Sequence, residues 1–144
     1  GLIRARRRQL DDAIADFTKA LELEPGYARG YYNRGLIYLM ANRLDDALAD
    51  FNKSIELEPN FAKSYYNRGA VYTEKKDFEN AGRDYDKAIE LEPDNGKYYI
   101  SRAVNNFNRQ KYDAAWADIE KAKQLKVSPS QKFLEALKKA SGRR

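Results

Sequence analysis

The sequence predicts an all-α protein built from repeated pairs of helices. Three of its four prolines, Pro25, Pro59 and Pro93, are spaced 34 residues apart. Each proline ends a similar phrase, "ALELEP", "SIELEP" or "AIELEP", so a whole unit recurs and not a single residue. Small and aromatic residues also recur at helical spacing between the prolines. These observations together predict a stack of similar helical units, each packed on its neighbours.

Each unit is expected to contain two amphipathic helices, at about 29–41 and 45–57 in the first complete copy. Tyr31, Gly35 and Tyr38 fall within about 40° of one another on the helical wheel. The small residue lets two helix axes approach, and the aromatic residues fill the space beside them. The proline ends the pair, because the residue before a proline is kept out of the α region.

The division of the chain follows from the period. We expect a partial repeat at 1–27, full repeats at 28–61 and 62–95, a degenerate repeat at 96–128 and a capping helix at 129–142. Gly1-Leu2-Ile3 aligns with Gly35-Leu36-Ile37. We therefore expect the chain to open in the middle of a first helix, as a fragment would, with a second helix starting near Asp11.

The last helix departs from the repeat and is predicted to cover the exposed end of the stack. Ser128 and Gln131 have the spacing of a capping box, and Pro129 suits the first helical position. Leu137 belongs to its apolar stripe, and Gly142 can end it.

A 34-residue period with small and aromatic residues at these positions resembles the tetratricopeptide repeat (TPR) family, over nearly the whole chain. The resemblance implies a right-handed α-solenoid in which the first helices line a concave groove. It also implies a scaffold for protein–protein interaction.

The groove wall implied by the resemblance is one face of the first helices, where spacings of three, four and seven place four residues of each helix. The expected groove residues are Arg29, Tyr32, Asn33, Leu36, Lys63, Tyr66, Asn67, Ala70, Lys97, Ile100, Ser101 and Val104. Asparagines can bond an extended peptide backbone, and tyrosines add contact area. The basic column favours an acidic segment or a C-terminal carboxylate. The alternative is a solvated face without a specific ligand.

Some TPR proteins bind chaperone tails through a two-carboxylate clamp. Asn67 with Lys97, or Asn33 with Lys63, is similar to part of it. Tyr32 and Leu36 replace the expected lysine and asparagine, and Ser101 replaces the arginine. The sequence therefore argues against chaperone-tail binding.

Opposite charges recur at the edges of the buried stripes, which suggests a ladder of ion pairs that fixes the register of the repeats. Its members are Asp16, Arg34, Asp50, Arg68, Asp84 and Arg102. Pairing between repeats would join Asp16 to Arg34, whereas pairing within a repeat would join Arg34 to Asp50. Another interpretation is that the arginines bind an acidic ligand.

One position of the second helices varies widely in size. It holds Ile14, Leu48, Gly82 and Trp116 in successive repeats. We expect Trp116 to fill the space that Gly82 leaves, and ligand stacking on Trp116 is the alternative.

The composition excludes several classes of site. There is no cysteine and no histidine, so disulfides, zinc fingers and imidazole catalysis are excluded. No nucleophile–base pair, phosphate-binding glycine loop or metal-ligand spacing occurs, so we expect no enzymatic activity and no cofactor. No apolar run approaches the ~20 residues of a membrane span. The composition favours a soluble protein, with a cytoplasmic location as the expectation.

The sequence thus favours a non-catalytic scaffold that binds an extended peptide or a partner helix. Residues 95–144 carry twelve basic and four acidic residues, so nucleic acid or an anionic surface is an alternative, less favoured partner. Self-assembly is another alternative, because the partial repeat leaves Phe17 and Leu21 with an incomplete partner helix.

Overall fold

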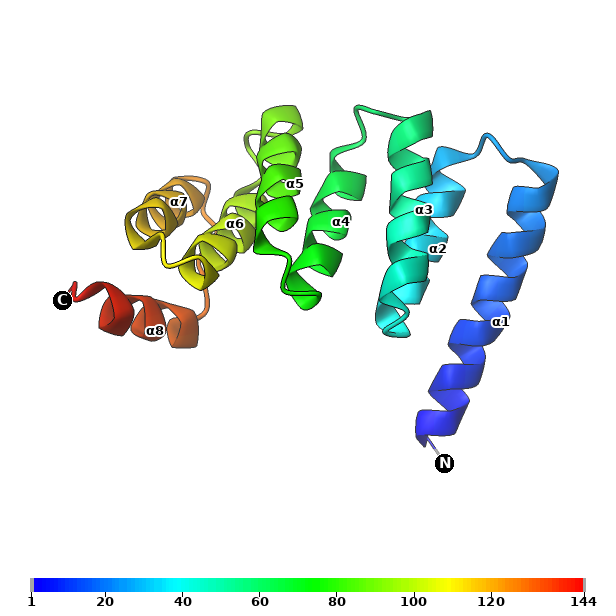
Figure 1. Ribbon diagram of the computed structural model, residues 1–144, viewed down its shortest axis with the longest axis horizontal. Coiled ribbons are helices and arrows are strands. Elements are labelled where there is room, and N and C mark those ends of the chain that lie inside the picture. The colour runs from blue at the N-terminus through cyan, green and yellow to red at the C-terminus, as the bar shows by residue number, and fades with distance from the viewer. Residues whose placement is uncertain (1, 144) are drawn as a thin grey trace. The chain divides into compact units, whose positions relative to one another are not determined.

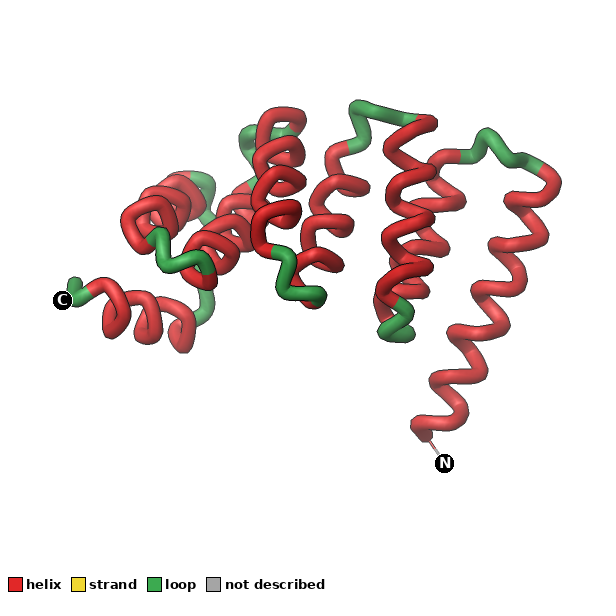
Figure 2. Tube along the Cα trace, in the orientation of Figure 1, coloured by secondary structure: helices red, strands yellow, loops and turns green. Residues whose placement is uncertain are grey.

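The structure is a computed structural model that describes residues 2–143. Within these residues it contains no strand and eight helices, joined by short loops (Figures 1 and 2). They are α1 (Leu2–Leu23), α2 (Ala28–Met40), α3 (Leu44–Leu57), α4 (Ala62–Glu74), α5 (Phe78–Leu91), α6 (Gly96–Asn108), α7 (Tyr112–Gln124) and α8 (Gln131–Ser141). The all-α prediction is confirmed, and Gly1 of the expected partial repeat lies outside the described residues.

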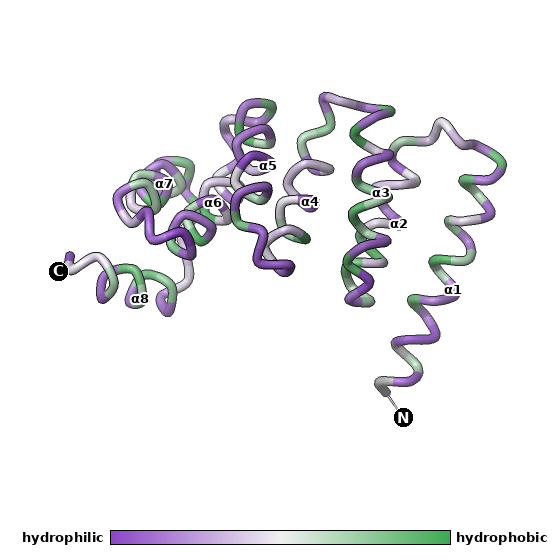
Figure 3. Tube along the Cα trace, viewed as in Figure 1, coloured by the Kyte–Doolittle hydropathy of each residue, from purple (hydrophilic) through white to green (hydrophobic). Residues whose placement is uncertain are grey.

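The chain divides into two compact units, residues 1–71 and 72–144, with the boundary inside α4. Hydrophilic and hydrophobic residues alternate along the helices (Figure 3), as expected for helices that bury one face. None of the helices within residues 2–143 combines the length and the apolar content that a bilayer span requires.

The core of the first unit lies where α3 meets α2 and α4. Ala47, Phe51 and Val71 are fully buried there. A Cβ on Gly35 would lie 2.9 Å from Cε1 of Phe51, so only glycine lets the ring come this close to the backbone of α2. The recurring small residue is therefore required by a specific contact in this unit.

The core of the second unit is closed by α8. Ala103 of α6, Ile119 of α7 and Leu137 of α8 are each 0% exposed. The rings of Phe133 on α8 and Phe107 on α6 meet edge to face, with centroids 5.7 Å apart. The terminal helix thus covers apolar surface of the last repeat.

The turns between the two helices of each repeat share one backbone conformation. Asn42, Lys76 and Gln110 have φ of 58°, 61° and 58°, in the left-handed region. The N–H that follows Asn42, that of Arg43, donates to the carbonyl of Tyr38 at 2.8 Å. This is the Schellman arrangement, which satisfies carbonyls at the end of a helix.

The corresponding turn is absent from α1, which is helical from Leu2 through Leu23. Arg8 stands there, at the position of Asn42 in the next repeat. Lys76 and Gln110 are equally good helix formers, so the residue type does not decide the turn; it forms where a complete first helix precedes it and the next helix folds back. The predicted first helix and the second helix near Asp11 are therefore one continuous helix.

The beginning of α8 also differs from the expectation. The N-cap is Ser130, whose hydroxyl accepts a hydrogen bond from the N–H of Phe133 at 3.3 Å. Ser130 has the extended backbone of an N-cap residue, and Pro129 is buried in front of it. The capping box of Ser128 and Gln131 is therefore wrong. Gly142 ends the helix as predicted, with φ of 68°.

Leu137→Ala is expected to lower the free energy of unfolding by about 2–5 kcal/mol, because the fully buried side chain would leave a cavity. Lys139→Ala, on the exposed side of the same helix, is the matched control and is expected to change it by less than about 0.5 kcal/mol. Urea denaturation followed by circular dichroism measures both. Equal effects would show that α8 adds nothing to the core.

Candidate functional site

Arg34 on α2 contacts the helices before and after it. Its Nε and Nη2 each donate to one carboxylate oxygen of Asp50 on α3, both at 2.7 Å. Its Nη1 donates to the hydroxyl of Thr18 on α1 at 3.0 Å. The rings of Tyr31 and Tyr38 flank the guanidinium, with centroids 5.7 Å away. One side chain therefore connects three helices.

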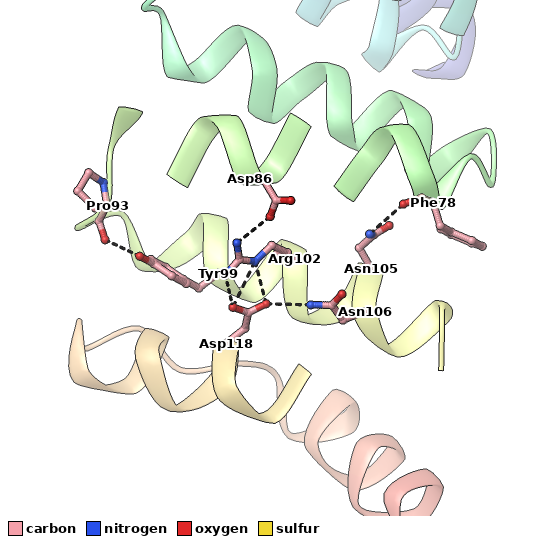
Figure 4. Close-up of polar contacts among 8 residues, drawn as sticks. All are labelled: Phe78, Asp86, Pro93, Tyr99, Arg102, Asn105, Asn106 and Asp118. Carbon is pink, nitrogen blue, oxygen red and sulfur yellow. Dashed lines mark hydrogen bonds and ion pairs between the residues drawn. The ribbon is translucent and has the colours of Figure 1, made fainter. Parts of the chain in front are cut away.

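Arg102 on α6 makes the equivalent connection in the second unit (Figure 4). Its Nη2 donates to Asp118 on α7 at 2.6 Å, and its Nη1 donates to Asp86 on α5 at 2.7 Å. Asn106 donates a further hydrogen bond to Asp118 at 3.1 Å. Burial by itself lowers the pKa of the Arg102 guanidinium, but the hydrogen bonds to Asp118 and Asp86 outweigh it, so the pKa is raised.

These contacts decide between the two pairings. Arg34 and Arg102 each pair with the aspartate of their own repeat, Asp50 and Asp118. The pairing of Asp16 with Arg34 is wrong, since Asp16 is exposed and Thr18 is the residue of α1 that contacts this arginine.

Arg68, the third arginine of the series, donates to Asn52 at 2.6 Å. Thr18, Asn52 and Asp86 each lie 16 residues before their arginine. The partner on the preceding helix is thus two residues beyond the aspartate that the between-repeat pairing required. Among residues 2–143, no group of three or more acidic, histidine or cysteine side chains could hold a metal ion.

Two of the expected groove residues of the first unit are linked to Tyr32, Asn67 directly and Arg29 through Phe61. The ring of Tyr32 meets Phe61 edge-on at 4.9 Å, and its hydroxyl accepts a hydrogen bond from the amide of Asn67 on α4 at 3.3 Å. Arg29 lies over the ring of Phe61 at 5.1 Å, and its Nη2 is 3.6 Å from Glu58. The α3–α4 loop therefore joins α2 and α4 in forming this surface.

The hydrogen bonds of Asn67 leave one acceptor and one donor available, which are Oδ1 of Asn67 and the hydroxyl hydrogen of Tyr32. The Nδ2 of Asn67 donates to the carbonyl of Lys63 at 2.9 Å as well as to Tyr32, and its Oδ1 accepts no hydrogen bond from residues 2–143. The hydroxyl of Tyr32 keeps its own hydrogen as a donor. Burial raises the pKa of Tyr32, and the hydrogen bond from Asn67 only partly offsets this, so the hydrogen is present at neutral pH.

The other expected groove residues of the first unit differ in their surroundings. Arg29 and Lys63 are exposed, whereas Asn33, Tyr66 and Ala70 are half-buried. Leu36 packs against the core around Phe51 and belongs to the core as much as to the surface.

Sequence reasoning did not identify Phe61 as a surface residue of this site. A signal was present, because an aromatic residue follows the proline by two positions both here and at Tyr27. In the second unit, Lys97 is exposed, Ser101 and Val104 are half-buried, and Ile100 packs against the core that includes Leu137.

Two further expectations are corrected. The Nε1 of Trp116 donates to Ser141 of α8 at 3.1 Å, so this tryptophan turns to the terminal helix and does not fill the space at Gly82. Leu21 is 4% exposed, and its Cδ2 would lie 2.8 Å from a Cβ on Gly30. Leu21 is therefore already covered, while Phe17 is half-buried.

Comparison with protein families identifies the repeat. A model described as tetratricopeptide repeat matches residues 28–61 and 62–95, and a model described as TPR repeat matches residues 1–41. The chain belongs to the tetratricopeptide repeat family. No curated protein matches the chain.

Several solved structures are similar to this TPR protein. A crystal structure of MamA is 26% identical with a TM-score of 0.79, over 81% of this chain and 68% of that one. YrrB, a TPR protein with an unusual peptide-binding site, is 28% identical with a TM-score of 0.71, over 76% of this chain and 56% of that one. The first TPR of Spaghetti (RPAP3), bound to the HSP90 peptide SRMEEVD, is 25% identical with a TM-score of 0.73, over 80% and 90%.

Asp50→Ala is expected to lower the free energy of unfolding by about 3–5 kcal/mol, because it leaves the guanidinium of Arg34 without its buried partner. Thr18→Val removes a neutral hydroxyl that accepts from Arg34 and donates to the carbonyl of Ile14, and is expected to cost about 0.5–1.5 kcal/mol. Arg43→Ala breaks the exposed ion pair with Asp46 and serves as the control, with a much smaller effect. Urea denaturation of the three variants compares them, and a cost for Asp50→Ala no larger than that of Arg43→Ala would contradict the structural role of the pair.

Proposed function

We propose that the protein is a non-catalytic scaffold that binds an extended peptide on the surface formed by α2, α4 and the loop between α3 and α4. The observation that carries the proposal is the paired donor and acceptor of Tyr32 and Asn67. An extended peptide presents one carbonyl and one N–H per residue. The Tyr32 hydroxyl can donate to the first, and Oδ1 of Asn67 can accept from the second.

The charges around this pair favour an acidic peptide segment or a C-terminal carboxylate. Arg29 and Lys63 are both exposed beside it, and the aromatic rings of Tyr32 and Phe61 supply contact area between them. Peptide binding by YrrB and by the RPAP3 domain supports a peptide as the ligand class. Tyr32 and Leu36 depart from the chaperone-tail clamp, so chaperone tails are not the expected ligands.

Asn33 offers a second amide on the same surface. It is half-buried and makes no side-chain hydrogen bond with residues 2–143. Both its donors and its acceptor are available, in contrast to Asn67, whose two N–H groups are already in use. We therefore place Asn33 among the backbone-binding residues and Asn67 as an acceptor only.

Tyr32→Phe is expected to weaken peptide binding by about three- to tenfold, because it removes the donor and keeps the ring. A peptide is first selected with the wild-type protein from an array of short acidic and neutral sequences, and its affinity is then measured by fluorescence polarisation. Asn67→Ala is expected to weaken binding similarly. Asn108→Ala, at an exposed asparagine of α6, which is not part of the proposed surface, is the control. Selection of no peptide, or equal affinity of all three variants, would refute the proposal.

A salt titration separates the peptide from a polyanion. Two exposed cations, Arg29 and Lys63, should make peptide binding fall only modestly as salt rises. A partner that contacts many phosphates would lose binding steeply, with a slope set by the number of contacts. A steep slope for a nucleic-acid probe, with no selected peptide, would favour the basic residues of the second unit as the binding surface.

A further inference from the structure

A polar pocket of about 320 Å³ lies between α5, α6 and α7 in the second unit. Its walls include Gly82 on α5, Arg102 and Asn106 on α6, and Lys111 and Ala114 at the start of α7. The network of Arg102 and Asp118 forms part of this wall (Figure 4). The pocket is at the lower end of the volumes found for small-molecule sites.

The pocket exists because two bulky residues of the repeat are missing here. Ile14 and Tyr38 stand two repeats before Gly82 and Asn106. In the first unit Ile14 is 8% exposed, and the ring of Tyr38 lies against Arg34. Glycine and asparagine cannot supply the same volume, so the equivalent space in the second unit stays open.

The charges at the pocket also depart from the repeat. Arg43, two repeats before Lys111, forms an ion pair with Asp46 at 2.7 Å. Ala114 stands at the position of Asp46, so Lys111 lacks this carboxylate and forms no ion pair with residues 2–143. An exposed cation without a protein partner therefore stands at the mouth of the pocket.

Arg109 supplies a second set of donors. It replaces Ala41 of the first unit. Its Nη2 is paired with Glu79, while its Nη1 would lie 3.1 Å from a Cβ on Gly82 and makes no hydrogen bond with residues 2–143. Since Gly82 has no side chain, this nitrogen borders the open space.

A buried amide beside the pocket is not explained by packing. Asn105 occupies the position of Ile37 and Val71, yet it is only 1% exposed. Its Nδ2 donates to the carbonyl of Phe78 at 3.0 Å and would lie 3.1 Å from a Cβ on Gly82. Its Oδ1 has no hydrogen-bond partner among residues 2–143. Such a buried unsatisfied acceptor disfavours folding, and because Oδ1 can only accept, it marks a polar wall and does not itself bind an anion.

We infer that this pocket binds an oxyanion group, a carboxylate or a phosphate, between Arg109 and Lys111. Arg102 also lines the pocket, where Asp118 and Asp86 balance its charge, so the anion-binding groups are Arg109 and Lys111. Asp86 borders the same space and opposes an anion, so it sets an upper limit on the affinity. The residues that line this pocket belong to α5, α6, α7 and the loop between α6 and α7, and none of them is among the residues of the proposed peptide surface.

The test is a titration of the ¹⁵N-labelled protein with inorganic phosphate and, separately, with acetate, at constant ionic strength. We expect saturable shifts of the backbone signals of Gly82 and Lys111 and of the side-chain Nε signal of Arg109. Ala114→Asp restores the carboxylate that Asp46 gives to Arg43, and is expected to weaken binding about tenfold. Ala114→Asn is the uncharged control and is expected to bind like the wild type.

Two further variants sharpen the result. Asp86→Asn removes the opposing carboxylate and is expected to tighten binding several-fold, whereas Lys121→Ala, on α7 outside the pocket, is expected to leave it unchanged. Ala114 and Lys121 are exposed, so these variants should fold, which circular dichroism verifies. Saturation by phosphate alone would assign a phosphate group, and saturation by acetate would admit acidic side chains of a partner. Shifts that rise without saturation, or equal affinity of Ala114→Asp and Ala114→Asn, would overturn the inference.

Discussion

A buried carboxylate must be compensated by a nearby cation, and the helix packing of this TPR protein depends on that requirement. Asp50, Asp84 and Asp118 are each only 4% exposed. Arg34 donates two parallel hydrogen bonds to Asp50, and Arg102 donates two to Asp118. Such paired hydrogen bonds restrict the orientation of the two helices as well as the distance between them. The remaining Nη1 of each arginine reaches the preceding helix, so a single side chain sets the positions of three helices.

The equivalent arginines have different surroundings in the two units. Arg34 holds one side of α2 against α1 and α3, and Tyr32 contacts α4 and the α3–α4 loop from another side of the helix. In the second unit, Arg102 is held in the same way, but Gly82 and Asn106 leave the space beside it open. In the first unit, the space beside the arginine is occupied by Tyr38, and Arg43 is paired with Asp46. In the second unit, the equivalent space is a pocket, and Lys111 has no such carboxylate.

The period of the sequence was sufficient to predict the buried faces of the helices, because a buried stripe depends only on spacing within one helix. It was insufficient to predict which residues the arginines bind. Asp16 recurs every 34 residues in register with Arg34, whereas the position of Thr18 holds Asn52 and Asp86 in the next repeats, and the period cannot tell which neighbouring helix each position faces. The continuity of α1 was missed for a related reason. Residues equivalent to Arg8 adopt a left-handed turn only where a second helix folds back on the first.

The sequence by itself determined the order and buried faces of the helices from Ala28 onward, the apolar cap near Leu137 and the basic and amide residues of the candidate surface. The tertiary structure alone decided which aspartate pairs with Arg34 and with Arg102, and that the amide of Asn67 donates to Tyr32. It also decided that Trp116 contacts α8, whereas Arg109 and Asn105 lie next to Gly82. The physical reason is that these contacts join different helices. Their axial shift and rotation follow from how side chains of unequal size pack together, and a repeat period does not specify them.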